Sequence, residues 1–506
     1  MNSVLYLRHL NTHTMNHYFT LLPAILLLSL SSFAQQTINW GPEISVADGA
    51  TYGNIRPRLA LTTNDEPVVV FGKNGTGRLF VAKGNAGTFG TPVDILPANL
   101  GTYLANWTGP DIAAKGDTII AVFKALPFDE GKIYAVRSTD GGLTFSDTIR
   151  VDDHETGRTF LPALTIDANG NPIVDYMIFD GSNGNPRYVV AQSADAGLTY
   201  GQRVVASSTV TGEACDCCPA EMVTDGTNQL LLFRNNESNI RDIHAVRSTD
   251  GGTTFPTATD MEELGWFITS CPSTGPHGVI IGDSLFMVSA SRATGSYRIY
   301  IGSGNLSGGN LALVNQTSPI PPTNNNGTQN YPRISGEGNT MVLVWEEKET
   351  SNPDVFCAVV NNGNINSFAD YKARVNIITT GVQTNPDIVY KNGFAHIVYQ
   401  DAASGDVIYR KGTVSAVAGT TENGFSTLSV APNPSVNGVF VISGLSTEIA
   451  HWSVTDLSGK AVAGNLVKLS KGLEITLDAA VGNGVYLLTL ENQQGQQLTT
   501  QLVVGR

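Results

Sequence analysis

The chain has 506 residues, more than one ordinary hydrophobic core encloses, so at least two domains are expected. Its 53 glycines and 23 prolines, with few charged residues and no long helical periodicity, indicate an all-β protein rich in turns. The formal net charge of −14 argues against nucleic acid or an anionic membrane as a partner.

The N-terminal segment has the features of an export signal. Residues 19–33 (FTLLPAILLLSLSSF) form an apolar run that ends in the small-x-small pattern Ser32-Phe33-Ala34 before Gln35. Residues 1–34 are therefore predicted to be a signal peptide, with Met15 as an alternative start. Because no later run reaches about 18 apolar residues, no transmembrane span is expected in the mature protein.

The sequence that follows repeats itself. Each repeat opens with a proline at the start of an apolar strand, and consecutive prolines stand 52 to 60 residues apart. About 13 residues after most of these prolines, a second β-run ends in an aromatic residue. Four short strands in each repeat predict the blade of a β-propeller. The opening pairs are Arg56-Pro57, Gly109-Pro110, Leu161-Pro162, Cys218-Pro219, Cys271-Pro272, Tyr331-Pro332 and Asn385-Pro386.

Seven repeats favour seven blades, with six as the alternative, since the fifth repeat offers two opening prolines, Pro272 and Pro276. The last repeat has only three strands, and residues 38–46 (INWGPEISV) have the pattern of the missing fourth. We therefore predict one propeller over residues 36–413, closed by its N-terminal strand so that no sheet edge stays open.

One motif recurs in the turn between the third and fourth strands of three repeats. It occupies residues 138–145 (STDGGLTF), 193–200 (SADAGLTY) and 248–255 (STDGGTTF). The Asp accepts turn amides, the Gly allows positive φ, and the aromatic residue fills the blade. The motif resembles the Asp box of sialidase-type propellers (BNR repeats), where it is structural and lies on the face away from the usual active site.

The C-terminal part has a strand pattern of its own. A Ser/Ala/Gly/Thr-rich linker covers residues 414–427. Residues 428–506 then contain APNPS (431–435), VTDLSGKAV (454–462), GNGVYLLTL (482–490) and the basic end TTQLVVGR. They resemble the type A sorting domain of the type IX secretion system (Por secretion), a small β-sandwich. The resemblance implies a Gram-negative source, the secretion machinery as a partner, and a secreted or cell-surface location.

Three propeller segments resemble sialidases (neuraminidases). Residues 221–235 are similar to the family's segment that links a Glu to the second arginine, and residues 291–302 to the segment with the third. Residues 331–347 are similar to the segment that starts at the nucleophilic tyrosine and ends in an aromatic-Glu pair. The resemblance implies an exo-α-sialidase that needs no cofactor and removes terminal sialic acids from extracellular glycans or glycoproteins.

Each candidate site residue has a role that this chemistry explains. Tyr331 would be the nucleophile, because a carboxylate would be repelled by the sialic acid carboxylate, and Glu221 would be its base. Asp129, in the loop after the second strand of blade 2, would serve the leaving group. Three guanidinium groups would clamp the substrate carboxylate through charge-assisted bonds. They belong to Arg56, Arg234 and Arg292.

Two departures from the sialidase pattern leave other functions open. The family has six blades, and its acid lies in the first blade, whereas Asp129 lies in the second. The alternatives are a non-catalytic propeller that binds glycan or protein and a cysteine-stabilised or metal-binding propeller of unknown activity. The sequence leaves open whether the protein is an enzyme.

Four of the five cysteines are close enough in the predicted fold to interact. Two disulfides among Cys215, Cys217, Cys218 and Cys271 are favoured in an exported protein, with Cys218 and Cys271 within disulfide reach. A thiolate and imidazole site for zinc or Cu(I) that adds His277 is the alternative. Cys357 is predicted to be a buried free thiol.

Charged residues also follow four of the strand-opening prolines. Their signs alternate around the predicted ring, which favours a belt of ion pairs between blades. They are Arg58, Asp111, Arg333 and Asp387.

Overall fold

The computed structural model describes residues 37–415 and 429–505, except for short gaps at residues 86, 182–183, 227, 309–310, 317–319, 325, 350, 361–362, 370, 444–448, 458, 470–471 and 493–496. The predicted signal peptide and most of the predicted linker lie outside the described residues. The chain divides into a unit over Gln35–Ala418 and a second compact unit that contains Gly419–Arg506.

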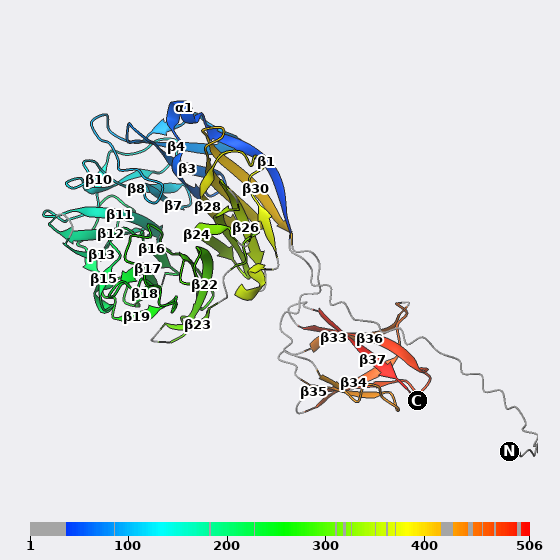
Figure 1. Ribbon diagram of the computed structural model, residues 1–506. Helices are drawn as coiled ribbons and strands as arrows, with labels where there is room; N and C mark the ends of the chain where they lie inside the picture. Colours follow the sequence, from blue (N-terminus) through cyan, green and yellow to red (C-terminus); the bar gives the residue numbers. More distant parts are fainter. Residues whose placement is uncertain are drawn as a thin grey trace, which may run out of the picture. The chain divides into compact units, whose positions relative to one another are not determined.

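The first unit is a ring of seven antiparallel sheets, which confirms the predicted propeller (Figure 1). The inner strands of blades 1 to 7 are β2 (Ile55–Leu61), β7 (Asp111–Lys115), β11 (Thr159–Ile166), β16 (Glu221–Thr224), β20 (His277–Ile281), β24 (Thr328–Glu337) and β28 (Gln383–Lys391). The second strands are β3 (Pro67–Lys73), β8 (Thr118–Lys124), β12 (Pro172–Asp180), β17 (Gln229–Asn236), β21 (Ser284–Ser291), β25 (Thr340–Lys348) and β29 (Phe394–Asp401).

The third strands are β4 (Arg78–Asn85), β9 (Ile133–Ser138), β13 (Gly184–Gln192), β18 (Ile243–Ser248), β22 (Arg298–Asn305), β26 (Pro353–Val360) and β30 (Val407–Ser415). The outer strands are β5 (Thr88–Phe89) with β6 (Val93–Asp94), then β10 (Ile149–Arg150), β14 (Val204–Val205), β19 (Thr257–Asp260), β23 (Ala312–Gln316), β27 (Lys372–Arg374) and β1 (Thr37–Ala47). Short additions are α1 (Gly49–Tyr52), β15 (Glu213–Ala214) and the 3-10 turns Ser207–Thr209 and Ile365–Ala369.

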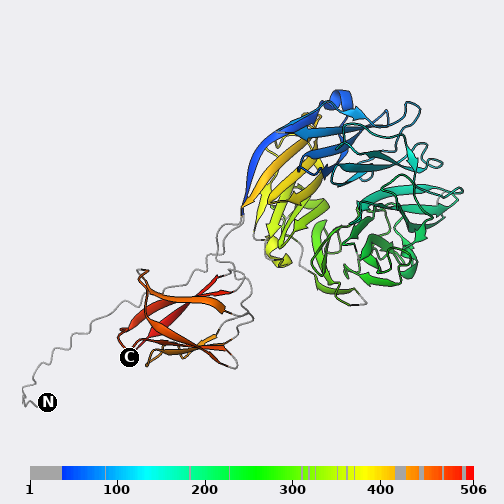
Figure 2. The same cartoon turned by 180° about the vertical axis from the view of Figure 1, so that it is seen from behind.

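The ring closes as the sequence predicts. Strand β1 pairs antiparallel with β30, from Thr37 opposite Ser415 to Ala47 opposite Val407, and so supplies the outer strand of blade 7 (Figures 1 and 2). The blade therefore joins the first described strand of the propeller to the last, which removes the free edge that either strand would otherwise expose.

The core explains the apolar character of the second strands. In β3 and β8, residues 68–71 (VVVF) and 119–123 (IIAVF) have no exposed side-chain surface. Each blade packs against a neighbour on both faces, so these strands read as continuous apolar runs instead of alternating patterns. The fifth blade begins at His277, which makes Pro276, and not Pro272, the strand-opening proline.

The three turns that share the S-x-D-x-G-x-T motif have one hydrogen-bond pattern. In the first, the Asp140 carboxylate accepts the Leu143 and Thr144 N–H groups at 3.0 Å each and the Ser138 hydroxyl at 2.7 Å. Asp195 and Asp250 repeat this arrangement, and hydrogen bonds from Thr199 and Thr254 lower the pKa of each carboxyl to about 2. The motif thus rigidifies the turn, as its sequence suggests.

The C-terminal unit is a small β-sandwich. One sheet has the order β31 (Ser429–Ala431), β32 (Val439–Ser443), β35 (Gly472–Leu477) and β34 (Gly464–Leu469). The other contains β33 (Ile449–Asp456), β36 (Gly484–Asn492) and β37 (Gln497–Val504). Phe440, Ile475, Leu488 and Leu502 are fully buried in the core of this unit.

Candidate functional site

Four of the inner strands begin with a bulge at the residue before the strand-opening proline. At each bulge two residues oppose one on the second strand, and the first of them has a positive φ near 50°. Such a conformation costs a non-glycine residue of order 1–3 kcal/mol, and functional sites often contain it. Three of these residues line a pocket on the propeller axis, which we call the axial pocket. The four are Arg56, Leu161, Tyr331 and Asn385.

Residues near the start of three inner strands each bind the backbone of the following blade. The Asp387 and Asp111 carboxylates accept the backbone N–H groups of Leu59 and Leu164, at 2.8 and 2.9 Å. His277 Nδ1 accepts the Ile334 N–H at 3.1 Å in the same way. The three acceptors occupy equivalent positions, because each lies opposite a valine of the second strand of its own blade.

The predicted ion-pair belt is present in part. Arg333 donates to Asp387 at 2.9 Å and to Glu221 at 3.3 Å, which links blades 4, 6 and 7. Arg58 and Asp111 form no ion pair with any described residue.

Glu221, the predicted base, belongs to this belt. Its Oε1 lies 3.1 Å from His277 Nε2 and its Oε2 lies 3.3 Å from Arg333. Burial raises the pKa of Glu221, but His277 and Arg333 lower it more, so the carboxylate is held ionised. Since His277 Nδ1 accepts the Ile334 N–H, the neutral imidazole carries its proton on Nε2 and donates it to Glu221.

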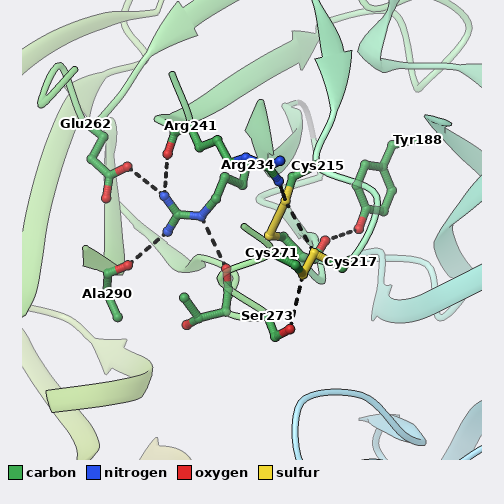
Figure 3. The surroundings of a disulfide bond; sticks show 11 residues. Tyr188, Cys215, Cys217, Arg234, Arg241, Glu262, Cys271, Ser273 and Ala290 are labelled. Carbon is green, nitrogen blue, oxygen red and sulfur yellow. Dashed lines mark hydrogen bonds and ion pairs between the residues drawn. A yellow bond between two sulfur atoms is a disulfide. The ribbon is translucent and has the colours of Figure 1, made fainter. Parts of the chain in front are cut away.

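Arg234, the predicted second arginine of the clamp, is a fully buried structural residue (Figure 3). Its guanidinium donates to the carbonyls of Thr274, Arg241 and Ala290 at 3.3, 2.6 and 3.0 Å. It also pairs with Glu262 at 3.1 Å. Through these hydrogen bonds Arg234 connects segments of blades 4 and 5. It does not line the axial pocket.

Arg292 and Asp129 both lie on exposed loops. Arg292 donates to Gly295 of its own loop at 3.4 Å and lies 5.7 Å from the Tyr297 ring centroid. The Asp129 side chain is 66% exposed and 4.0 Å from Arg158. Neither residue lines the axial pocket, so the structure does not bring the three predicted clamp arginines together.

The axial pocket contains two arginines without a carboxylate partner among the described residues. Arg56 donates to the Asn106 carbonyl at 3.3 Å, and the buried Arg58 donates to the Pro57 carbonyl at 2.8 Å. Burial lowers the pKa of Arg58 to about 10, and it lowers the pKa of Arg56 well below the usual range. Burial and the repulsion from Arg333 make both cations costly, and the charge of Asp111, joined for Arg58 by Asp387 and Glu221, offsets part of this cost without forming an ion pair.

Two polar residues that the sequence did not suggest also line this pocket. Asn385 is 1% exposed, and its side-chain amide nitrogen and oxygen have no hydrogen-bond partner among the described residues. Thr274 is also 1% exposed, and its hydroxyl has no hydrogen-bond partner among the described residues. Asn385 precedes a strand-opening proline, as Arg56 and Tyr331 do, and that shared position is a signal that could have identified it.

Tyr331 has Glu346, and not Glu221, as its acidic neighbour. The residue before it, Asn330, pairs with Glu346 across β24 and β25. Burial and the Glu346 charge raise the pKa of Tyr331 to about 12, while Arg56 acts to lower it. Burial raises the pKa of Glu346 to about 7, although its carboxylate accepts hydrogen bonds from the Thr384 hydroxyl and the Asn385 N–H. The sequence offered a clue in the Trp345-Glu346 pair.

The four clustered cysteines form two disulfides, Cys215–Cys218 and Cys217–Cys271, with Cα atoms 5.5 and 6.3 Å apart. The sequence predicts two disulfides among these four cysteines without specifying their pairing, and the structure contains two. The expected proximity of Cys218 to Cys271 assumed that both hold equivalent blade positions. Because blade 5 opens at Pro276, Cys271 lies earlier, in the preceding loop. Cys357 is a buried free thiol, as predicted, and burial raises its pKa to about 12.

The alternative metal site would use cysteine side chains that form disulfides in this structure. The Sγ atoms of Cys215, Cys217 and Cys218 lie within 4.8 Å of one another, but all belong to disulfides. His277, the additional ligand considered, is engaged by Glu221 and the Ile334 N–H.

The Cys217–Cys271 disulfide (Figure 3) joins two segments that line one side of the axial pocket. Cys217 lies just before Pro219 and Ala220, and Cys271 just before the segment from Ser273 to Pro276, all of which line the pocket. The two segments touch so closely that a Cβ on Gly275 would lie 2.0 Å from the Pro219 carbonyl oxygen. The disulfide therefore holds together parts of two blades.

We expect Cys271→Ser to lower the free energy of unfolding by about 2–4 kcal/mol, because the bond closes a long loop. Urea denaturation of the variant and the wild type, both unreduced, measures this. Peptide mapping of the unreduced wild type checks the pairing, and recovery of a Cys218–Cys271 peptide would contradict it.

Comparisons with known proteins identify the C-terminal unit. Residues 429–505 match the family model described as the secretion system C-terminal sorting domain, so this unit is a type IX sorting domain. No curated protein matches the sequence significantly. Among the described residues, no helix has the length and apolar character needed to cross a membrane.

Solved structures similar to the chain include several propellers. A protein of unknown function from Dyadobacter fermentans DSM 18053 is 11% identical, with 75% of this chain and 99% of that chain covered and a TM-score of 0.45. Polysaccharide lyase Uly1 is 9% identical, with coverage of 74% and 100% and a TM-score of 0.46. The Hadza microbial sialidase Hz136 is 11% identical, with coverage of 67% and 73% and a TM-score of 0.41.

Proposed function

We propose that this protein is a secreted glycoside hydrolase that removes terminal acidic sugars, in the first place sialic acids, from glycans outside the cell. The observation that carries the proposal is the pair Arg56 and Arg58. Both guanidiniums line the axial pocket without a carboxylate partner among the described residues. A sugar carboxylate would neutralise them through charge-assisted hydrogen bonds.

The remaining polar groups of the pocket suit the rest of such a sugar. The side chains of Asn385 and Thr274 offer donors and acceptors that no other described residue uses. Sugar hydroxyl groups both donate and accept hydrogen bonds. A small number of polar groups in the wall of a pocket is usually enough to orient the bound ligand.

In this proposal Tyr331 lines the axial pocket, and Glu346, which is not among the lining residues, acts on Tyr331 from the neighbouring strand β25. The Tyr331 oxygen attacks the anomeric carbon while Glu346 takes the phenolic proton, and a solvent water protonates the aglycone oxygen, so the aglycone leaves as an alcohol and a hydroxide remains. A second water then attacks the anomeric carbon and gives its proton to that hydroxide, while Glu346 returns its proton to the departing Tyr331 oxygen, so two displacements give net retention. A base with a pKa near the working pH is the most effective, and burial gives Glu346 such a value.

The test is release of sialic acid from sialyllactose by the full chain, with Arg56→Ala as the variant. Loss of the Arg56 charge should weaken binding of the acidic glycan at least tenfold and leave binding of lactose unchanged. If the wild type binds sialyllactose without releasing sialic acid, the protein is a glycan-binding propeller. Equal binding of lactose and sialyllactose would refute recognition of an acidic sugar.

The rate should depend on pH through Glu346. Its base form takes the proton, and its pKa is raised to about 7, so kcat/KM should fall about tenfold for each pH unit below 7. Tyr331 stays protonated over this range because its pKa is about 12. Measuring kcat/KM of the wild type as a function of pH tests this fall, and Glu346→Gln should abolish the fall below pH 7. A profile that is flat from pH 5 to 8 would exclude Glu346 as the base.

Export should depend on the C-terminal unit. Deleting residues 429–505 removes the sorting domain, so we expect the truncated protein to remain in the periplasm of a strain with type IX secretion. Immunoblots of the periplasmic and extracellular fractions measure this, and secretion of the truncated protein at the normal level would contradict it.

A further inference from the structure

Trp107 occupies an unusual place in the axial pocket. It is the one tryptophan among the lining residues, and it is half-buried. The indole N–H makes no hydrogen bond to any described residue. An aromatic ring with one apolar face and a free polar edge suits a ligand that has both characters.

The backbone around Trp107 is held in a fixed shape. Ala105 and Thr108 exchange backbone hydrogen bonds of 2.9 and 3.3 Å, which form a tight turn with Trp107 inside it. The Asn106 carbonyl accepts from Arg56, and Gly109 lies against the Arg56 stem, where a Cβ would approach within 3.3 Å. Trp107 is therefore positioned directly beside the arginine that recognises the acidic sugar.

The ring itself is fixed by an aromatic cluster behind it. Trp107 meets Phe160 edge-on, with centroids 5.6 Å apart and an angle of 85°. Phe160 in turn packs against Tyr103 and Phe128, at 5.4 and 5.0 Å. The Arg158 guanidinium packs on Phe128 and Phe160, at 4.7 and 5.3 Å.

The loops that carry this cluster are also joined. Lys124, a buried residue, donates to the carbonyls of Ala125, Pro127 and Gly131, and its own carbonyl accepts the Tyr103 N–H at 2.9 Å. Rigid positioning lowers the entropy that a ligand must lose on binding, as expected of a prepared subsite.

We propose that Trp107 is a stacking subsite for the sugar to which the terminal acidic sugar is attached. The C–H face of a neutral pyranose would pack on the indole face, and a hydroxyl would accept from the indole N–H. The inference rests on the proposed function and extends it, because it specifies that the substrate is an acidic sugar linked to a neutral one.

The test compares ligands of different length on the full chain, with Tyr331→Phe added throughout to stop turnover. Calorimetry measures the affinity for methyl α-sialoside, which has one sugar, and for sialyllactose. We expect sialyllactose to bind about tenfold more tightly, and Trp107→Ala to abolish this difference while changing the methyl sialoside affinity less than twofold. Trp107→Phe should retain most of the difference in affinity between the two ligands.

Phe267 provides the matched control, because its side chain is aromatic and 65% exposed and does not line the axial pocket. Phe267→Ala should leave both affinities unchanged. If both ligands bind equally well to the protein with Trp107 intact, or if Trp107→Ala weakens both equally, the subsite does not exist although the proposed function stands. If neither ligand binds, the proposed function fails as well.

Discussion

Replacing Arg234 by methionine should lower the free energy of unfolding by roughly 3–5 kcal/mol, because it leaves the buried Glu262 carboxylate without its cation. It also leaves the carbonyls of Thr274, Arg241 and Ala290 without their donor. Methionine is unbranched and keeps much of the volume, so the loss reports on the polar contacts. Denaturation monitored by tryptophan fluorescence measures the effect, since Arg234 lies 4.9 Å from the Trp266 ring.

Two further variants separate this explanation from a general sensitivity of the fold. Arg292→Met removes an exposed arginine and should change the stability by less than about 0.5 kcal/mol. Glu262→Gln combined with Arg234→Met removes the unpaired charge, so it should recover part of the loss. If Arg234→Met were as stable as the wild type but bound sialyllactose poorly, Arg234 would be a ligand residue after all.

Replacing Tyr331 by phenylalanine should reduce kcat for sialoside hydrolysis by at least about 10³-fold, because the nucleophilic oxygen is lost. The stability should change little, since the ring and the bulge with its φ of 49° are retained. Affinity for sialyllactose should stay within a few-fold, because Arg56, Arg58 and Asn385 remain in the axial pocket.

Single-turnover measurements distinguish a lost chemical step from a slow release of product. An intermediate in which the sugar is covalently bound to Tyr331 should be detectable by mass spectrometry after acid quenching of the wild type. Turnover by Tyr331→Phe at more than a tenth of the wild-type rate would show that another group, or water, makes the attack.

The propeller could be predicted from the sequence because its repeats carry a strong signal. Each blade has a proline at the start of its inner strand, and most of the apolar second strands end in an aromatic residue. That pattern located all seven blades and the closing role of residues 38–46. Only the fifth opening was misplaced, by four residues, while the two disulfides expected among Cys215, Cys217, Cys218 and Cys271 are present.

The direction of individual side chains could not be predicted in the same way. Both faces of a blade are buried against neighbours, so alternation along a strand does not show which side chain reaches the pocket. Arg234 follows an apolar run that ends at Phe233, and nothing in that run shows that its guanidinium points at Glu262. Glu346 lies near Tyr331 through the pairing of β24 with β25 inside blade 6, whereas the contact of Glu221 with Arg333 joins two blades far apart in sequence.

The pairing of β1 with β30 also determines when this protein can finish folding. Residues 37–47 are synthesised before almost all of the propeller, yet their partner strand, residues 407–415, is the last part of it to be made. Until then the N-terminal strand has no neighbour, and such a distant contact is slow to form because the whole intervening chain must be ordered. The formation of blade 7 is therefore the step that closes the ring. In a chain that stops before residue 407, β1 and β29 both lack β30 as their partner. Their unpaired backbone groups can then form hydrogen bonds with strands of other molecules.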